Sequence, residues 1–582
     1  MTNDPRRGIT LIDLIISISI IALLFGGIYV VYISIESSIS GAAVRTAAVA
    51  AIDNELEIVR NLPYEDVGTI GGIPAGVIPQ AQTVSQGNYL FSLQTTVLNI
   101  DDPYDTSPSS SPVADYKLVD ITAACLQCGN AAAVEITTTV APTRLAQGTP
   151  YGSIFINAMN ASGLPVADAT VQVVNASVTP SVDLTDTTNA SGVLKLIGVP
   201  TSTQGYGIFI SKPGYTVAQT YPPGGAGNPN PVQPDITVAT ATVSQVTLAI
   251  DRVSALDVAT EDDRCNAVAS QPFSAMGQRI IGTNPNVLAF STTTQTSSSG
   301  TAVLADLAWD TYTLAFGGTG FDLAGTIPLD PVILPPNTAQ PFAFILAPAA
   351  DPSLLVTVKD AMTGAGIPQA QVGLVNGGTS FTLTTDHAFI SQSDWSGGAY
   401  AAQNGGIDAS SPGVITLLAN ASSSYPTSTL DWLESNTFDV GGASSTFNAL
   451  SWVPISQPAG TFVEFQVAAD NDNATWNFVG PDGTSATYFT ASPAVLPASL
   501  AGNRYFRYKV FMETGSPSLT PSVSGVTLDF AANCVPPAQA LFTNLPQATY
   551  SLSVAASGYA QATGTVAVGA GEQSTTILMT PN

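Results

Sequence analysis

The first 61 residues carry two different hydrophobic patterns. Residues 14–35 form a run of 22 residues without a charge, which is long enough to cross a bilayer as a helix. Farther on, apolar residues recur at the spacing of one helix face, at Val49, Ile52, Leu56 and Val59. Pro63 disfavours helical geometry at the residue before it. We therefore expect one helix over residues 9–61, with residues 9–35 as its transmembrane part. The later stripe would pack on the protein's own sheet.

The rest of the chain alternates apolar and polar residues over short stretches, the pattern of strands with one buried face. Residues 88–98, 115–121 and 133–140 are expected strands that follow the helix, and 461–468 and 504–511 are expected strands near the end. Fifty glycines and 41 prolines supply the turns between such stretches. The pattern predicts a mainly β protein with one long N-terminal α-helix. A chain of 582 residues is also too long for one core, so we expect several domains.

Charge and composition exclude some functions. Acidic residues number 42 and basic residues 15, which gives a net charge of −27. Nucleic-acid binding needs clustered Lys and Arg, and only Arg6 and Arg7 stand together, so we expect no nucleic-acid partner. With 45% hydrophobic and 10% charged residues, the chain also lacks the composition of a disordered protein.

Asp13 is the feature that a plain signal anchor does not explain. Arg6 and Arg7 would set the cytoplasmic side of the membrane. Asp13 stands one residue before the uncharged run. A carboxylate at the bilayer centre costs roughly 2.5–3.5 kcal/mol on insertion scales, and even near the edge it needs a partner. This indicates a function for Asp13 beyond anchoring.

Gly8, Ile9 and Asp13, followed by the apolar helix, resemble the class III prepilin signal of type IV pilins and type II secretion pseudopilins. The resemblance implies cleavage after Gly8 by a prepilin peptidase and methylation of the new N-terminus at Ile9. It also implies that Asp13 pairs with the terminal amine of a neighbouring pilin subunit, and that an inner-membrane assembly platform is a partner. The family usually has Phe or Met at the position of Ile9 and Glu at that of Asp13. Both replacements keep the chemistry, although Asp is one methylene shorter.

Three later segments share a pattern of an alternating strand, a turn, further short strands, and a Tyr within a strand that ends at Gly and an aromatic residue. They resemble the carboxypeptidase regulatory-like family, a transthyretin-type β-sandwich that is not catalytic. The matching positions are Pro165, Gly192, Val199, Pro200 and Gly214-Tyr215; Gly300, Leu307, Tyr312 and Gly320-Phe321; and Pro368, Leu545, Pro546, Tyr550 and Gly558-Tyr559. The second segment has Ala308-Trp309 where the others have Pro. The third is interrupted, which indicates an inserted domain.

Together these features give a domain organisation of a pilin-like α+β head followed by tandem transthyretin- or Ig-like sandwiches. The expected boundaries are a leader at 1–8, the helix at 9–61, a pilin-like β domain at 62–145, sandwiches at 148–251 and 252–350, a split sandwich at 351–389 plus 535–582, and an inserted sandwich at 390–534. Trp395, Trp432, Trp452 and Trp476 all lie in the insertion. We expect them in its core, with an exposed sugar-stacking platform as the alternative.

The four cysteines allow three pairings. In an exported chain we expect disulfides, at Cys125–Cys128 and Cys265–Cys534. A redox site at the Cys125-Leu-Gln-Cys128 motif is disfavoured, because a thioredoxin-type motif opens a helix in a βαβ unit, whereas this region is rich in strands. A zinc site made by all four cysteines is also disfavoured.

Other candidate sites are weaker. Acidic loops occur at Asp101-Asp102 with Asp105, at 261–263 and at 470–473, but none has EF-hand spacing, so we expect solvated turns, no metal and no cofactor. The single histidine, His387, has no nucleophile near it in sequence, and we expect no enzymatic activity. Asn-x-Ser/Thr triplets begin at Asn160, Asn175, Asn189, Asn420 and Asn473. Such triplets arise by chance in a chain rich in Ser, Thr and Asn, and they receive little weight.

We therefore expect a minor or tip subunit of a prokaryotic type IV pilus-like filament. It would sit in the cytoplasmic membrane before assembly and then display its sandwiches at the cell surface, where a receptor or glycan is a possible partner. The alternatives are a pseudopilin of a type II secretion or DNA-uptake system and an uncleaved membrane-anchored binding protein.

Overall fold

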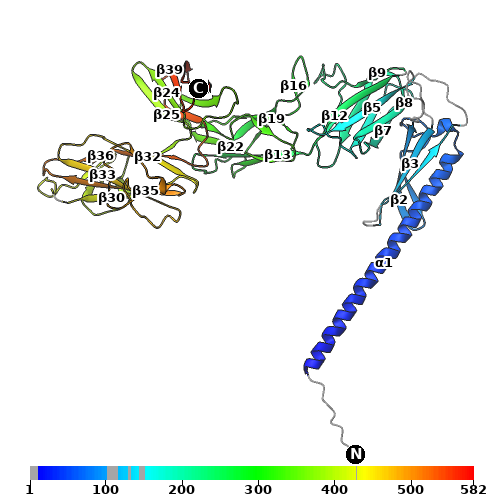
Figure 1. Cartoon of the computed structure of the whole chain (residues 1–582), viewed down its shortest axis with the longest axis horizontal. Helices are drawn as coiled ribbons and strands as arrows, with labels where there is room; N and C mark the ends of the chain where they lie inside the picture. Colours follow the sequence, from blue (N-terminus) through cyan, green and yellow to red (C-terminus); the bar gives the residue numbers. More distant parts are fainter. Residues whose placement is uncertain (1–10, 101–115, 129–132, 143–150, 241, 428) are drawn as a thin grey trace, which may run out of the picture. The chain divides into compact units, whose positions relative to one another are not determined.

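The computed structural model describes the chain except residues 1–10, 101–115, 129–132, 143–150, 241 and 428, and it gives no side chains for residues 11–28, 30–34, 37 and 38. The described residues confirm the predicted fold class, mainly β with one long helix near the N-terminus. They divide into two compact units, one within residues 11–252 together with 280–287, and one within residues 253–279 and 288–582. Figure 1 shows the elements.

The head of the first unit is one helix on one antiparallel sheet. Helix α1, Leu11–Asn61, ends two residues before Pro63, as predicted. Its sheet has the order β1-β2-β3-β4. The bounds are β1 Ala81–Gln86, β2 Tyr89–Ile100, β3 Tyr116–Cys125 and β4 Val134–Val140. In Figure 1, α1 lies along this sheet with its C-terminal half.

A sandwich of eight strands completes the first unit. Its sheets are β10-β9-β6-β7, with β11 paired to β9, and β12-β5-β8. The bounds are β5 Tyr151–Met159, β6 Thr170–Asn175, β7 Val182–Thr187, β8 Val193–Pro200, β9 Ser202–Ser211, β10 Ala218–Gln219, β11 Ile236–Val238 and β12 Val243–Ala249. A small hairpin, β15 Ile280–Gly282 with β16 Val287–Leu288, contacts this sandwich through the bond from the Val232 N–H to the Ile281 carbonyl.

The second unit begins with a sandwich of two four-stranded sheets. Their orders are β18-β13-β22-β20 and β17-β14-β19-β21. The bounds are β13 Ser254–Glu261, β14 Pro272–Gly277, β17 Ser291–Gln295, β18 Thr301–Leu307, β19 Asp310–Phe316, β20 Phe321–Ile327, β21 Val332–Leu334 and β22 Ala339–Pro348.

The next sandwich is assembled from two distant parts of the chain. Its sheets are β38-β23-β41 and β25-β24-β39-β40. The bounds are β23 Ser353–Asp360, β24 Gln371–Asn376, β25 Thr379–Thr384, β38 Gln539–Phe542, β39 Ala548–Ala555, β40 Ala562–Val568 and β41 Glu572–Met579. Strand β23 thus pairs with β38 and β41, roughly 180 to 220 residues farther along, and residues between them form a separate core.

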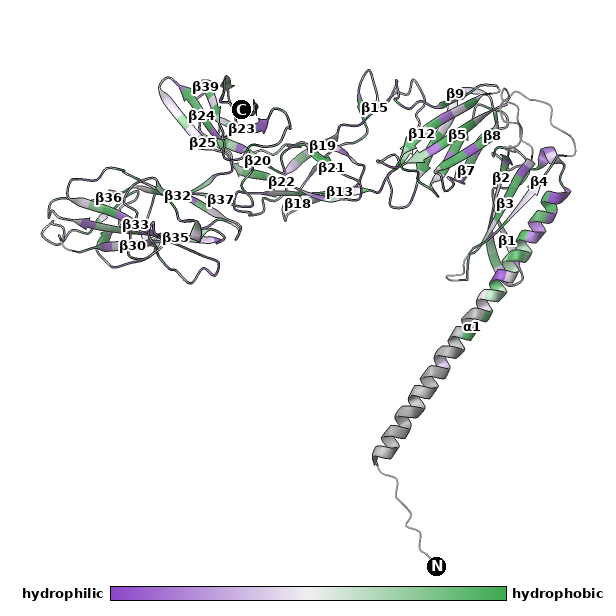
Figure 2. Cartoon of the chain, viewed as in Figure 1, coloured by the Kyte–Doolittle hydropathy of each residue, from purple (hydrophilic) through white to green (hydrophobic). Residues whose placement is uncertain are grey.

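That separate core belongs to the inserted domain. Its sheets are β26-β37-β32-β34, β27-β30-β35-β31 with β33 on β35, and β28-β29-β36. The bounds are β26 Ala388–Gln392, β27 Tyr400–Gln403, β28 Ile407–Asp408, β29 Ile415–Leu417, β30 Asp431–Ser435, β31 Phe438–Asp439, β32 Thr446–Val453, β33 Thr461–Asp470, β34 Ala494–Val495, β35 Tyr505–Thr514, β36 Ser522–Val523 and β37 Gly525–Ala531. Figure 2 shows apolar residues interspersed with polar ones along the strands, in keeping with one buried face.

The three sandwiches outside the insertion share one connectivity. The first strand of each, β5, β13 or β23, runs parallel to the last, β12, β22 or β41. A buried tyrosine recurs, and its hydroxyl donates to a backbone carbonyl a few residues upstream, Tyr206 to Pro200, Tyr312 to Ala308 and Tyr550 to Pro546, at 2.7–2.8 Å. The Ala308 carbonyl thus does in the second sandwich what the Pro carbonyls do in the others.

Candidate functional site

The C-terminal half of α1 is held by the head's own sheet. Ile52, Leu56 and Val59 are buried, as the stripe predicts, whereas Val49 is only half-buried because Ala48 and Ala51 face the sheet in its place. They pack in one core with residues of β2 and β3, namely Phe91, Leu93, Val97, Val119, Ile121 and Ala123. The contact fixes the helix to the head through small and aliphatic side chains.

The N-terminal half of α1 has no such partner where its side chains are described. Tyr29, Ile35 and Ile39 are 65%, 54% and 65% exposed. Among the side chains that the structure describes, the first buried one along α1 is Val44. The helix continues for 33 residues before it, which is about 50 Å at 1.5 Å per residue. Figure 1 shows this part extending past the sheet of the head. It is a long apolar rod whose described side chains the head does not cover.

The predicted processing and assembly residues lie at the start of this rod. Gly8 and Ile9 lie outside the described residues, and Asp13 belongs to α1 without a described side chain. Within the part of the chain that the structure describes, no helix combines the length and hydropathy of a membrane span. Most side chains of residues 14–35 lie outside that part. The membrane segment, the cleavage at Gly8 and Ile9 and the pairing of Asp13 therefore remain predictions.

A buried lysine fixes the segment that follows α1. Lys117 of β3 donates from Nζ to the carbonyl oxygens of Tyr64 and Val67, at 2.7 and 2.5 Å. Its ammonium also lies 4.6 Å from the centroid of the Tyr64 ring. Burial lowers the pKa of Lys117 to about 8. The sequence pattern did not indicate this contact, because a lone lysine in a strand is usually solvent-exposed.

Carboxylates gather on the other face of the head sheet, where the first sandwich packs. Asn99 donates to the Ile197 carbonyl at 2.7 Å, which joins the head to β8. On the face of β3 opposite Val119 and Ile121, burial, a hydrogen bond to Glu135 and the charges of Glu135 and Asp186 raise the pKa of Asp120 to about 7. The contact between the head and the first sandwich thus contains acidic groups that repel one another at neutral pH.

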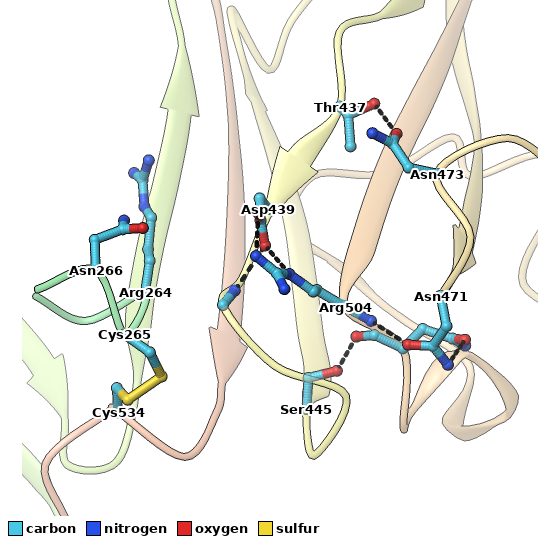
Figure 3. Close-up of polar contacts among 12 residues, drawn as sticks. Arg264, Cys265, Asn266, Thr437, Asp439, Ser445, Asn471, Asn473, Arg504 and Cys534 are labelled. Carbon is cyan, nitrogen blue, oxygen red and sulfur yellow. Dashed lines mark hydrogen bonds and ion pairs between the residues drawn. A yellow bond between two sulfur atoms is a disulfide. The ribbon is translucent and has the colours of Figure 1, made fainter.

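Both disulfides lie at domain edges. Cys125 is joined to Cys128 at the end of β3, and the intervening Leu126 is 53% exposed. Cys265 is joined to Cys534, 269 residues farther on, in the second unit. This bond links the β13–β14 loop to the segment that leaves the inserted domain (Figure 3).

Beside this disulfide, the inserted domain also contacts the β13–β14 loop through the segment that contains Asp439 and Gly441. Asp439 accepts two hydrogen bonds from the Arg504 guanidinium, at 2.8 and 2.9 Å, and these bonds hold the pKa of Asp439 below its usual value. Two residues on, a Cβ at Gly441 would clash with the Arg264 carbonyl oxygen. The backbones therefore approach as closely as a glycine allows, which orients the inserted domain on its neighbour. Figure 3 shows Asp439 and Arg504 of the inserted domain together with Arg264.

The four tryptophans of the insertion divide into two pairs. Trp395 and Trp452 are buried in the core, as predicted. Trp432 and Trp476 are half-buried on the outer side, where the Lys509 ammonium lies 4.1 Å from one ring and the Arg507 guanidinium 4.4 Å from the other. These cations also pair with Glu434, at 3.7 and 2.8 Å. One face of each of these two rings is therefore already occupied by a cation, which favours a structural role for both rings over sugar stacking.

His387 and the acidic loops have local structural partners. His387 Nδ1 lies 2.7 Å from Asp529 Oδ1, and Nε2 lies 3.0 Å from Gln369 Oε1. Asp262 accepts from the N–H groups of Arg264 and Asn266, so it closes the loop that carries Cys265. The carboxylates of the 470–473 loop likewise cap their own turns. Asp101, Asp102 and Asp105 lie outside the described residues.

Comparison with known proteins gives matches among solved structures only. No protein-family model matches the chain, and no curated protein matches its sequence. Similar solved structures include GBS52, the minor pilin of Streptococcus agalactiae, at 12% identity over 34% of this chain and 97% of that chain, with a TM-score of 0.18. A streptococcal ancillary pilin is 9% identical over 74% of this chain and 98% of that chain, with a TM-score of 0.15. The Bacillus anthracis TIE protein is 13% identical over 53% of this chain, with a TM-score of 0.15, and this chain spans 64% of its length. Scores this low assign no function.

Proposed function

We propose that the chain is a type IV pilin-like subunit, minor or tip-located, that assembles through the N-terminal half of α1 and displays its sandwiches at the cell surface. The observation that carries the proposal is the division of α1. One half is buried by the head's sheet, and the other continues for about 50 Å with exposed apolar side chains at every described apolar position before Ser40. An apolar helix of this length is stable only in a membrane or against other helices.

The charges at the start of the helix supply the assembly step. Cleavage between Gly8 and Ile9 would leave a free amine on Ile9, and Asp13 would be the fifth residue of the mature chain, so that both charges lie in an apolar medium. Pairing this amine with the Asp13 carboxylate of a neighbouring subunit satisfies both charges and sets the axial stagger of the subunits. A prepilin peptidase, an assembly platform in the cytoplasmic membrane and other pilin subunits are the partners that this step requires.

We propose that the sandwiches serve display and binding and that they take no part in catalysis. His387 is engaged by Asp529 and Gln369, and the shared tyrosine contacts stabilise folds. More than 400 residues of sandwiches on each subunit would crowd a tightly packed filament, which favours a minor or tip position. A surface receptor or a glycan is the partner we propose for them.

The test is incorporation of Asp13 variants into filaments in the cells that make the protein. Asp13→Ala should leave the protein in the membrane fraction and remove it from sheared filaments, whereas Asp13→Glu should restore incorporation, because it keeps the carboxylate. Asp53→Ala is the matched control, since Asp53 is an exposed carboxylate on the same helix. Unchanged incorporation of Asp13→Ala would refute the assembly step.

Two alternatives give different outcomes in the same experiment. A pseudopilin of a secretion or DNA-uptake system would show the same dependence on Asp13, but in secretion or uptake, with no subunit in sheared filaments. An uncleaved membrane-anchored binding protein would remain in the membrane fraction in every variant.

A further inference from the structure

Three turns share one hydrogen-bonded geometry, and each begins with the triplet Asn-Ala-Ser. They start at Asn160, Asn189 and Asn420. In each turn, the carbonyl of the first residue accepts from the N–H of the fourth, at 2.8–2.9 Å, and its N–H donates to the carbonyl of the fifth. The asparagine Oδ1 accepts from the N–H groups of the third and fifth residues, at 2.9–3.1 Å.

This turn does not require a serine at its third position. Turns with the same backbone bonds begin at Asp262 and Gly480, and they have Arg264 and Asp482 there. Only the N–H of the third residue takes part in the asparagine turns. The hydroxyls of Ser162, Ser191 and Ser422 have no hydrogen-bond partner among the described residues, and all three serines are exposed.

The asparagine amides of these turns are accessible. Asn189 and Asn420 are exposed, and Asn160 is half-buried. The Oδ1 atoms face the turn, so each Nδ2 is directed away from these N–H groups. Nδ2 of Asn160 and Asn189 has no partner in the described part of the chain, and Nδ2 of Asn420 bonds only to the hydroxyl of the half-buried Ser424. Each turn therefore presents an accessible amide nitrogen. It also presents a serine hydroxyl that the fold of the turn does not use.

The two remaining triplets differ in the hydroxyl, and the triplet at Asn175 differs in the accessibility of its amide as well. Asn175 is 1% exposed, and the Ser177 hydroxyl donates to its Oδ1 at 2.7 Å. Asn473 is exposed, but its Oδ1 accepts from Thr437 at 2.8 Å (Figure 3), and the Thr475 hydroxyl is held by Asp472 at 2.7 Å. In these two triplets the fold uses the hydroxyl that a modifying enzyme would have to recognise.

We propose that Asn160, Asn189 and Asn420 are N-glycosylation acceptors and that Asn175 and Asn473 are not. An Asn-x-Ser/Thr triplet on a surface loop of an exported chain is the acceptor motif for this modification. The donor is a lipid-pyrophosphate-linked oligosaccharide. A bond forms between Nδ2 and C1 of the first sugar, the bond from C1 to the pyrophosphate oxygen breaks, the lipid pyrophosphate leaves, and Nδ2 loses a proton.

The proposal has a consequence for the first sandwich. The turns at Asn160 and Asn189 lie side by side, because the Ala158 N–H donates to the Gly192 carbonyl at 2.8 Å. Two glycans would therefore cover one end of this sandwich and add hydration to a chain with few charged residues. The inference shares with the proposed function only the export of the sandwiches.

The test is peptide mapping by mass spectrometry of the full chain purified from the cells that make it. Peptides with Asn160, Asn189 and Asn420 should carry one common glycan mass, and those with Asn175 and Asn473 should have their unmodified masses. Unmodified masses at all three turns, or equal modification at Asn175, would overturn the proposal.

Ser191 variants separate recognition from folding. Ser191→Ala should remove the glycan from Asn189 and leave the turn intact, because the turn uses only the N–H of this residue, and Ser191→Thr should keep the glycan. Thr475→Ala is a control and should change no glycan mass. A glycan that persists on Asn189 in Ser191→Ala would contradict the proposal. Filaments with unmodified subunits would refute only this inference, and glycosylated subunits without filaments would refute only the assembly proposal.

Discussion

The two halves of α1 show how one helix can serve two partners. In the C-terminal half, apolar residues recur at helical spacing, and the sheet of the head buries Ile52, Leu56 and Val59. In the N-terminal half the apolar residues follow one another without a polar face, and Tyr29 and Ile39 are 65% exposed. A periodic stripe is sufficient for one sheet, whereas an apolar surface all round requires a partner on every side. The difference indicates that the fold of the head is complete without the N-terminal half.

The largest effect should come from the buried half. Ile52 is fully buried, so Ile52→Ala should destabilise the head by about 3 kcal/mol through lost burial and the cavity left behind. Hydrogen exchange of the β2 and β3 amides, read by mass spectrometry on the full chain, measures this effect. Protection equal to that of the natural protein would show that the sheet does not depend on the helix.

A smaller loss of stability is expected where Lys117 of β3 holds the segment that follows α1. Lys117→Met keeps the aliphatic stem but removes the donor to the carbonyls of Tyr64 and Val67, which should cost about 1–3 kcal/mol. Faster exchange should be confined to the head. Lys195→Met, on an exposed lysine of the first sandwich, is the control and should leave the head amides unchanged.

The opposite face of the head sheet should show a pH dependence. The folded-state pKa of Asp120 is raised from 3.8 to about 7, so the folded protein binds this proton more tightly than the unfolded chain does. The stability from this group is complete below about pH 4 and is lost as the pH rises through 7. Asp120→Asn should remove this loss and stabilise the head by about 1 kcal/mol at pH 8. Exchange protection of β3 and β4 at pH 5 and pH 8, corrected for intrinsic rates, tests this. An unchanged pH dependence in the variant would assign it to other groups.

The smallest effect on stability should come from the free half. Ile39→Ala should change the stability of the head by less than about 0.5 kcal/mol, because the side chain is already exposed. The same substitution should reduce incorporation into filaments if the free half packs against other subunits. Normal incorporation would show that the exposed side chain of Ile39 takes no part in contacts between subunits.

Periodicity predicted much of the fold because burial has a period. The stripe of α1, its end before Pro63 and the strands around Phe465 and Tyr508 follow from it. Ala48 and Ala51 face the sheet where Val49 was expected, because small residues allow close contact. The first strand of the head, β1, was missed, since AQTVSQ has no strongly apolar face.

Contacts between distant residues were less predictable. Lys117, the Glu434–Arg507–Lys509 cluster and the approach of Gly441 to Arg264 depend on which strands become neighbours, and no local pattern records that. The turns at Asn160, Asn189 and Asn420 were visible as triplets, but their shared geometry and their free hydroxyls became evident only in three dimensions.

The central claim is that the free half of α1 is a processed assembly segment, and N-terminal sequencing of material sheared from the cell surface tests it most directly. The account predicts a mature chain that begins at Ile9 and carries a methyl group on its amine. A membrane-bound chain that still begins at Met1, with none in the sheared fraction, would contradict it.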